Sequence, residues 1–131
     1  MRRVKRLLAV AVLAAALLSV VGPVQPASAD HRSSCTVTYL CVWWNSSWNA
    51  PPPITAQHYS FRDNNPSWAQ WAINNDDSSS YSRGTTGRVA IIHTGYTYSG
   101  TSVVCLAPGG SKAQHNPNDA GSSNDWVWAC Y

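Results

Sequence analysis

Aromatic and β-branched residues, in place of leucine, supply most of the large apolar side chains after residue 29. Seven Trp, six Tyr and one Phe fall in this part of the chain, and Leu40 is its only leucine before residue 100. Such side chains favour strands because they pack well on a pleated, half-buried surface. No window shows apolar residues sustained at helical spacing, while Gly, Pro, Ser, Asn and Thr interrupt the chain throughout. The pattern predicts a small all-β domain.

The first 29 residues differ in character and are typical of a secretory signal. Four basic residues within positions 2–6 precede an apolar run over residues 7–21, which is shorter than the roughly 20 residues of a membrane span. The segment ends in Ala27-Ser28-Ala29, the small-residue pattern at which signal peptidases cleave. We predict a signal peptide over residues 1–29 and a secreted, extracellular domain over residues 30–131. A retained membrane anchor is the alternative.

The positive charge of the full sequence belongs to this leading segment. Four of the nine basic residues lie in it and none of the six acidic ones does, so residues 30–131 carry five basic and six acidic side chains. A net charge of −1 gives no support for a nucleic-acid partner or an anionic membrane. The remaining length suffices for one domain, which we expect to be a monomer.

All four cysteines, Cys35, Cys41, Cys105 and Cys130, follow the signal segment. In an exported chain two disulfides are the default expectation. Of the three pairings, we favour Cys35 with Cys41, which would fasten the N-terminal arm to the first strand, and Cys105 with Cys130, which would join a late strand to the last. A zinc site is the rival, but no C-x-x-C motif occurs and the histidines are scattered.

Strands are expected at residues 36–44, 54–61, 78–83, 89–94, 101–106 and 126–131. In residues 89–94 apolar side chains occupy both faces, which predicts a strand covered on two sides. Residues 84–87, Gly-Thr-Thr-Gly, form the clearest linker and divide the chain into halves of about 36–83 and 88–131.

The two halves resemble each other in the spacing of particular residues. With one deletion the matched pairs are Trp43 with His93, Trp48 with Tyr98, Ala50 with Gly100, and Asn75-Asp76 with Asn124-Asp125. In the second half the aromatic and glycine spacing fits a strand that folds over into a hairpin, where a residue without Cβ is needed at the tight point.

Several motifs occur in a recognisable order: an N-terminal cysteine pair that ends in Leu40-Cys41-Val42-Trp43, the hairpin of residues 93–100, the segment of residues 104–109, and two Asn-Asp loops. Over roughly residues 35–130 the chain resembles the βγ-crystallin-type domains of a secreted actinobacterial peptidase-inhibitor family, the metalloproteinase-inhibitor type. The resemblance implies an all-β, βγ-crystallin-like β-sandwich of two Greek-key motifs. It also implies that the partner is an extracellular peptidase, which the protein inhibits. Ala50 and His93 depart from the family pattern.

The resemblance further implies a calcium loop, which in βγ-crystallin domains resembles N/D-N/D-x-x-S/T-S. Residues 75–80 (NDDSSS) fit this pattern, and Asn75, Asp76, Asp77 and Ser79 are the candidate ligands, with Asp77 and Ser79 bound through their side chains. Calcium takes six to eight oxygen ligands, so a partner loop would have to complete the shell. Alternatively, the Asp and Ser side chains only bond to backbone groups and close a corner between strands.

The second Asn-Asp loop is the natural partner in this alignment. There Trp128 and Ala129 stand where hydroxyl residues belong, so the second site is expected to lack its hydroxyl ligands. Calcium is the one cofactor that the sequence suggests.

Inhibition requires an exposed, stiff loop, for which residues 45–53 and 83–88 are the candidates; the sequence does not identify the inhibitory loop. The alternative function is a calcium-binding or polysaccharide- and cell-wall-binding module without inhibitory activity. Sugar binding would use exposed indole rings, expected at Trp44, Trp48, Trp68 and Trp71, whereas Trp43, Trp126 and Trp128 are expected to be buried.

We do not expect an enzyme and assign no catalytic residue. Residues 30–131 contain no glutamate, no H-E-x-x-H or G-x-S-x-G motif, and no cysteine expected to be free. His31, His58, His93 and His115 lie in separate segments, so a structural role with satisfied hydrogen bonds is expected for each.

Overall fold

The computed structural model describes residues 30–54 and 57–131, so the predicted signal segment lies outside the described residues. Their elements in chain order are η1 (Arg32–Ser34), β1 (Leu40–Trp43), β2 (Tyr59–Phe61), β3 (Ser79–Ser82), β4 (Val89–His93), η2 (Tyr96–Tyr98), β5 (Ser102–Leu106), β6 (Ser111–Lys112) and β7 (Ser123–Val127). The domain is all-β, as the sequence predicts. Within the described ranges no helix has the length and apolar character needed to cross a membrane.

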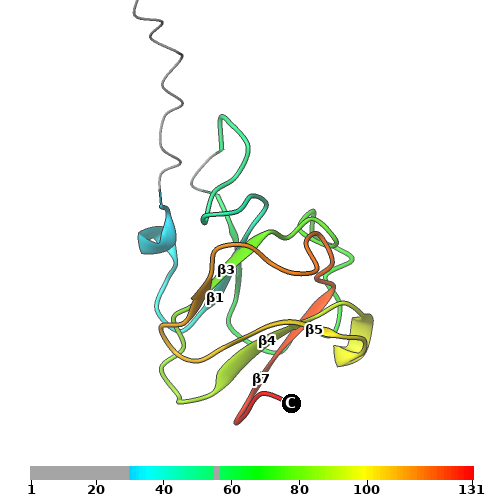
Figure 1. Ribbon diagram of the computed structural model, residues 1–131. Helices are drawn as coiled ribbons and strands as arrows, with labels where there is room; N and C mark the ends of the chain where they lie inside the picture. Colours follow the sequence, from blue (N-terminus) through cyan, green and yellow to red (C-terminus); the bar gives the residue numbers. More distant parts are fainter. Residues whose placement is uncertain (1–29, 55–56) are drawn as a thin grey trace, which may run out of the picture.

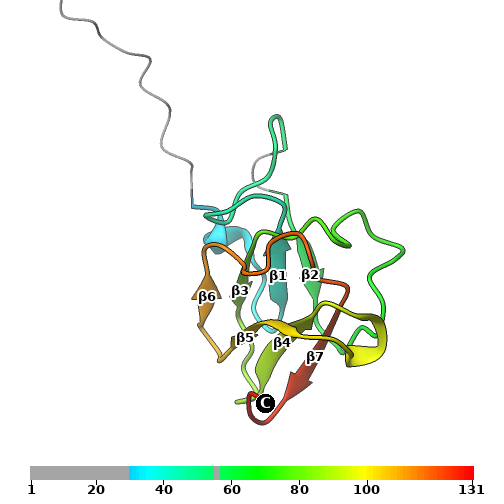
Figure 2. The same cartoon turned by 45° about the vertical axis from the view of Figure 1, so that its right-hand side comes forward.

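The strands form two antiparallel sheets, with the orders β2-β1-β3-β6 and β5-β4-β7, that make the two layers of a sandwich (Figure 1). In Figure 2 the pairing of β6 beside β3 is visible, although β6 comes from the second half of the chain. Conversely, Asn65 of the first half forms a bridge with Asn124 of β7. Each half therefore contributes an edge to the sheet of the other, as two interlocked Greek keys require.

The main core fills the space between the sheets. Leu40 and Val42 of β1 face Ala90 and Ile92 of β4 within one cluster, and Trp68 completes it. The Trp68 ring is fully buried and stacks on Phe61 at 4.7 Å between centroids. Aromatic and β-branched side chains thus build the core, in agreement with the composition.

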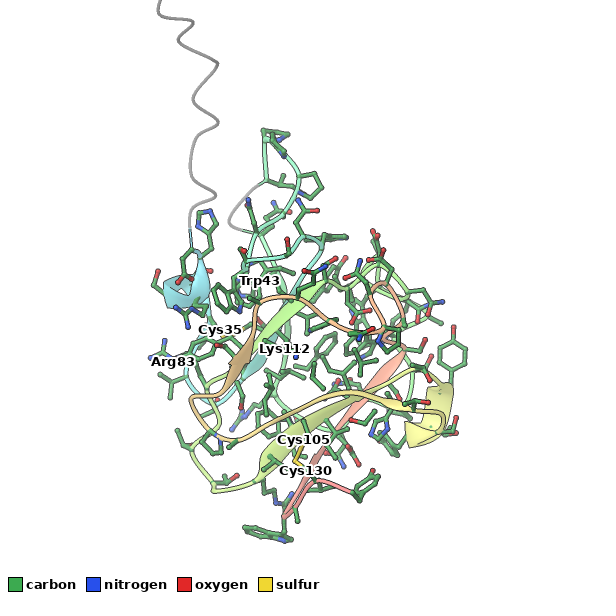
Figure 3. The ribbon with its side chains drawn as sticks, in the orientation of Figure 1. Cys35, Trp43, Arg83, Cys105, Lys112 and Cys130 are labelled. Atoms are coloured by element: carbon green, nitrogen blue, oxygen red, sulfur yellow. A yellow bond between two sulfur atoms is a disulfide. The ribbon has the colours of Figure 1, made fainter. Side chains whose placement is uncertain are left out.

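The outer faces of the two central strands are covered by the chain ends. Cys41 and Trp43 of β1 are buried under the N-terminal arm, which the Cys35–Cys41 disulfide fastens. On the other sheet the Cys105–Cys130 disulfide ties the C-terminal tail to β5 (Figure 3). Both disulfides are the favoured pairs, and no cysteine within the described ranges is free. Because both faces of these strands are covered, β1 and most of β4 are buried. For β4 this confirms the prediction of a strand covered on two sides.

Several predicted strands begin or end elsewhere. β1 starts at Leu40 because Thr38 adopts a positive φ of 79° and the chain turns there. The final strand spans Ser123–Val127, not residues 126–131, because the chain then leaves the sheet to bring Cys130 to Cys105. The alternation of apolar residues over 126–131 therefore predicts a strand that the structure does not contain, because the disulfide draws these residues away from the sheet.

Candidate metal site in two crossed loops

Each half contains a folded hairpin, and the two hairpins match at the predicted spacing of 50 residues. The N–H of Asn45 donates to Asn49 O at 2.9 Å, and that of Gly95 donates to Ser99 O at 3.1 Å. Residues 47 and 48 both have positive φ, as do residues 97 and 98. Trp48 is therefore the structural counterpart of Tyr98, as the sequence predicts.

A serine anchors each hairpin in the same way. Ser79 Oγ donates to Asn45 O at 2.6 Å and accepts from the N–H of Trp48 at 3.0 Å. Ser123 Oγ donates to Gly95 O at 2.6 Å and accepts from the N–H of Tyr98 at 3.3 Å. Ser79 and Ser123 are consequently equivalent.

This equivalence corrects the predicted alignment of the two loops. The halves are offset by 44 residues here, so Asn75-Asp76 matches Asp119-Ala120 and not Asn124-Asp125. In this register the pattern N/D-N/D-x-x-S/T-S is met twice, at residues 74–79 (NNDDSS) and 118–123 (NDAGSS). The expectation that the second loop lacks its hydroxyls is wrong, because it rested on the recurrence of two letters and not on the anchoring serine.

The two loops cross and exchange side-chain contacts reciprocally. Ser78 Oγ of the first loop donates to Asp119 Oδ1 of the second at 3.3 Å. Ser122 Oγ of the second loop donates to Asn75 Oδ1 of the first at 2.9 Å. Two oxygen clusters result, each built from one hydroxyl and one carboxylate or amide oxygen of the opposite loop.

The backbone holds this crossing in place. Asn75 N–H donates to Gly121 O and Asp119 N–H donates to Asp77 O, both at 2.9 Å. Asn75 and Asp119 share the left-handed conformation, with φ of 55° and 52°. Asn and Asp tolerate that region better than most residues, which explains their presence at this position of both loops.

Two of the four predicted ligands have other partners. Asp77 is fully buried; its carboxylate accepts the N–H of Gly121 and lies 2.6 Å from His115 Nδ1. Ser79 Oγ is the hairpin anchor described above. Among the predicted set, Asn75 and Asp76 remain at the crossing, where Ser78, Asp119 and Ser122 join them as residues that the alignment missed.

The bond between His115 and Asp77 extends to Ser80, whose Oγ lies 2.9 Å from His115 Nε2. The order Ser-His-Asp resembles a nucleophilic triad, but all three residues are at most 2% exposed. Trp68 is the counterpart of His115: it donates through Nε1 to Asn124, as His115 contacts Ser80. Both ring nitrogens of this buried histidine have hydrogen-bond partners, which agrees with the structural role expected from the sequence.

Negative charge gathers at the crossing. Burial, followed by the charges of Asp119 and Asp77, raises the pKa of Asp76. A cation placed there would relieve this repulsion. The described residues contain no group of three or more His, Cys, Asp or Glu side chains arranged to hold a metal ion, so hydroxyl, amide and backbone oxygens would have to supply much of the shell.

A separate hollow of about 670 Å³ lies where β3 and β7 end. It is lined by the turn of residues 62–64, by residues 84–86 of the linker, and by Thr38, Arg88, Trp126 and Trp128. Trp128 stands here with 71% of its surface exposed, whereas Trp68 is fully buried. The sequence predicts a buried Trp128 and an exposed Trp68, and both predictions are wrong. Trp128 lies just beyond the end of β7, and Trp68 follows the 62–66 turn into the core. Trp43 and Trp126 are buried, as predicted.

The candidate inhibitory loops lie in different places. Residues 45–50 form the anchored first hairpin, which Ser47 N–H joins to Ala113 O at 2.7 Å, and the prolines at 51–53 that follow are exposed. The linker of residues 84–88 borders the hollow.

Two solved structures are similar to the chain. One, described as "Evolution of the eye lens beta-gamma-crystallin domain fold", aligns with a TM-score of 0.56 and 14% identity over 71% of this chain and 89% of its own. The other, described as "Crystal structure of N-terminal domain of protein S", aligns with a TM-score of 0.48 and 19% identity over 68% and 94%. No protein-family model and no curated protein matches. With its two antiparallel sheets, the protein has a βγ-crystallin-like fold.

Proposed function

We propose that the protein is an exported βγ-crystallin-like module that binds calcium at the two crossed loops. The observation that carries the proposal is the reciprocal contact of Ser78 with Asp119 and of Ser122 with Asn75. Calcium prefers hard oxygen ligands from carboxylates, amides, hydroxyls, backbone carbonyls and water, and tolerates irregular geometry. The crossed loops supply these ligand types from both halves, so the ion would also hold the two halves together.

The two oxygen clusters differ in charge, and this predicts unequal affinities. Ser78 faces the carboxylate of Asp119, and Asp76 lies near enough to have its pKa raised by Asp119. Ser122 faces only the neutral amide of Asn75. Because the charge of the ligand set tunes calcium affinity, the cluster of Ser78 and Asp119 should be the tighter site.

Isothermal calorimetry with calcium tests this proposal, with magnesium as the comparison ion. Asp119→Asn should weaken the tighter site while it keeps the hydrogen bond from Ser78. Asp63→Asn removes an equal charge from an exposed turn and serves as the matched control. Unchanged calcium binding in Asp119→Asn, or the absence of calcium binding to the unmodified protein, would exclude a calcium site at the crossing.

As a second function we propose inhibition of an extracellular peptidase, which the family resemblance implies. The supporting observation is the exposed run of prolines at 51–53 beside a hairpin with fixed bonds to Ser79, Ser80 and Ala113. A loop ordered in advance loses less entropy when it binds, which favours affinity from a small contact.

Titration against a thermolysin-like and a subtilisin-like peptidase tests inhibition. Stoichiometric inhibition that is lost when Pro51 and Pro52 are replaced by serine, and kept in Pro108→Ser, would support the loop. No effect of the unmodified protein on either peptidase would leave the calcium-binding module as the function.

We also propose that the protein is exported to the cell exterior. Two disulfides indicate an oxidising compartment. Mass spectrometry of the protein from culture medium should find a chain that starts at Asp30, with no free thiol, and light scattering should find a monomer.

A further inference from the structure

We propose that the hollow at the ends of β3 and β7 binds an acidic pyranose, a uronate residue of an extracellular polysaccharide. The crossed loops precede Ser79 and Ser123, whereas the hollow follows Ser82 and Val127 at the other ends of the same strands. The inference gives the polysaccharide-binding alternative a site and a ligand class, and it does not depend on calcium.

The first argument is the distribution of positive charge. Residues 30–131 contain five basic side chains, and two of them, Arg62 and Arg88, line this one hollow. Arg32 pairs with Asp30 and Arg83 donates to Cys35 O, but Arg62 and Arg88 form no ion pair with any described residue. Guanidinium groups bind carboxylates through charge-assisted hydrogen bonds, often bidentate ones.

One acidic group, Asp63, also lines the hollow, so its local charge is +1 in a domain whose net charge is −1. A second hollow, lined by Arg32, Arg83 and Asp30, has the same formal charge. There, however, both arginines bind protein groups, whereas Arg62 and Arg88 have no ion-pair partner among the described residues. This contrast predicts a ligand with a negative charge.

The second argument is the exposed indole. Trp128 is 71% exposed, and the guanidinium of Arg88 lies 5.1 Å from the centroid of its ring. The cation–π contact holds the arginine next to the aromatic surface. A ligand that fits both groups has a flat apolar face for the indole and a carboxylate beside it, which describes a uronate ring.

The walls of the hollow are ordered before a ligand arrives. Gly84 lies against the Trp126 ring so closely that a Cβ at this position would come within 2.7 Å of it. Asn64 is fixed because its Oδ1 accepts the backbone N–H of Trp126 at 2.9 Å. Thr85 and Thr86 add hydroxyls at the rim for the hydroxyls of a sugar. Mostly apolar walls with a few fixed polar groups are typical of ligand sites.

The test uses the disulfide-bonded protein of residues 30–131 and trigalacturonate, with its methyl ester as a neutral ligand of the same shape. Binding is followed by tryptophan fluorescence and calorimetry in the presence of a chelator, because oligogalacturonates bind calcium themselves. We expect the acid to bind and the ester to bind more weakly, by on the order of a hundredfold, because it loses a charge-assisted hydrogen bond to each of the two arginines.

Variants separate the two parts of the site. Arg62→Gln and Arg88→Gln should each weaken the binding of the acid by on the order of tenfold and leave the binding of the ester unchanged. Trp128→Ala should weaken the binding of both ligands. Lys112→Gln and Tyr96→Ala, which change an exposed charge and an exposed ring elsewhere, should change the binding of neither ligand.

Three results would overturn the inference: no binding of trigalacturonate, equal affinity for acid and ester, or full binding by an Arg62→Gln/Arg88→Gln double variant. Tighter binding of a peptide with a free C-terminal carboxylate would assign the hollow to peptides instead. Each result is independent of calorimetry with calcium, because Asp119→Asn should leave uronate binding intact.

Discussion

Asp77→Ala removes a fully buried carboxylate from beneath the crossed loops. His115 Nδ1 and the N–H of Gly121 then lose their common partner in a site that water does not reach. An unsatisfied buried donor costs about 1–3 kcal/mol, and removal of one member of a buried pair costs about 3–5 kcal/mol. We expect the free energy of unfolding to fall by about 3–5 kcal/mol, out of a typical total of about 5–15 kcal/mol.

Urea unfolding under non-reducing conditions, followed by tryptophan fluorescence, measures this loss. Asp63→Ala is the control, since an exposed acid should change the free energy by no more than about 0.5 kcal/mol. The double variant Asp77→Ala/His115→Phe should lose less than the sum of its single variants, by about 0.5–3 kcal/mol, because neither partner is then left alone. Phenylalanine is a suitable replacement because the counterpart of His115 is the aromatic Trp68.

Two outcomes would refute this reasoning. A loss below about 1 kcal/mol for Asp77→Ala would mean that water or another group satisfies the donors. A loss that appears only when calcium is present would mean that Asp77 is a ligand, as the sequence suggested, and not a structural acceptor.

Three further predictions concern other parts of the molecule. Burial and two neighbouring carboxylates raise the pKa of Asp76, so its contribution to stability is present at low pH and is lost as pH rises through the folded-state pKa; in chelator, Asp76→Asn should abolish this loss in a series of urea melts between acidic and neutral pH. Replacement of Cys105 and Cys130 by alanine opens a link with a sequence separation of 25 and should cost about 3 kcal/mol in the same melts, mainly through the freed unfolded chain. Gly84→Ala places a methyl group against the buried Trp126 ring and should lower the free energy of unfolding by about 1–3 kcal/mol; an unchanged urea midpoint would show that the linker moves away freely.

The sequence predicts the architecture well because its signals are local or periodic. The spacing of Trp48 and Tyr98 identifies the two hairpins, and apolar side chains on both faces of residues 89–92 identify a doubly covered strand. Trp128 was misplaced because alternation alone does not show where a strand ends. That end depends on Cys130, which must reach Cys105 on β5, on the far side of β4 from β7.

The candidate site was half predictable. Both copies of the loop pattern, at residues 74–79 and 118–123, are present in the sequence, and alignment on the last serine of each would have found them. Alignment on Asn-Asp missed the second copy because the same letters recur at Asn124-Asp125 in the following strand. The bonds of Asp77 to His115 and Gly121 join residues about 40 positions apart, and nothing in the local sequence predicts them.

The exchange of edges between the two sheets has a consequence for how the chain can be divided. Lys112 of β6 pairs with β3 in the first sheet, and Asn65 forms a bridge with Asn124 of β7 in the second sheet. If the chain is cut in the linker, β3 therefore loses its partner β6 in one fragment, and β7 loses Asn65 in the other. Two fragments cut in the linker should therefore be disordered alone and regain the native spectrum when mixed. We therefore expect the repeats, although two copies of one pattern in sequence, to unfold as a single cooperative unit.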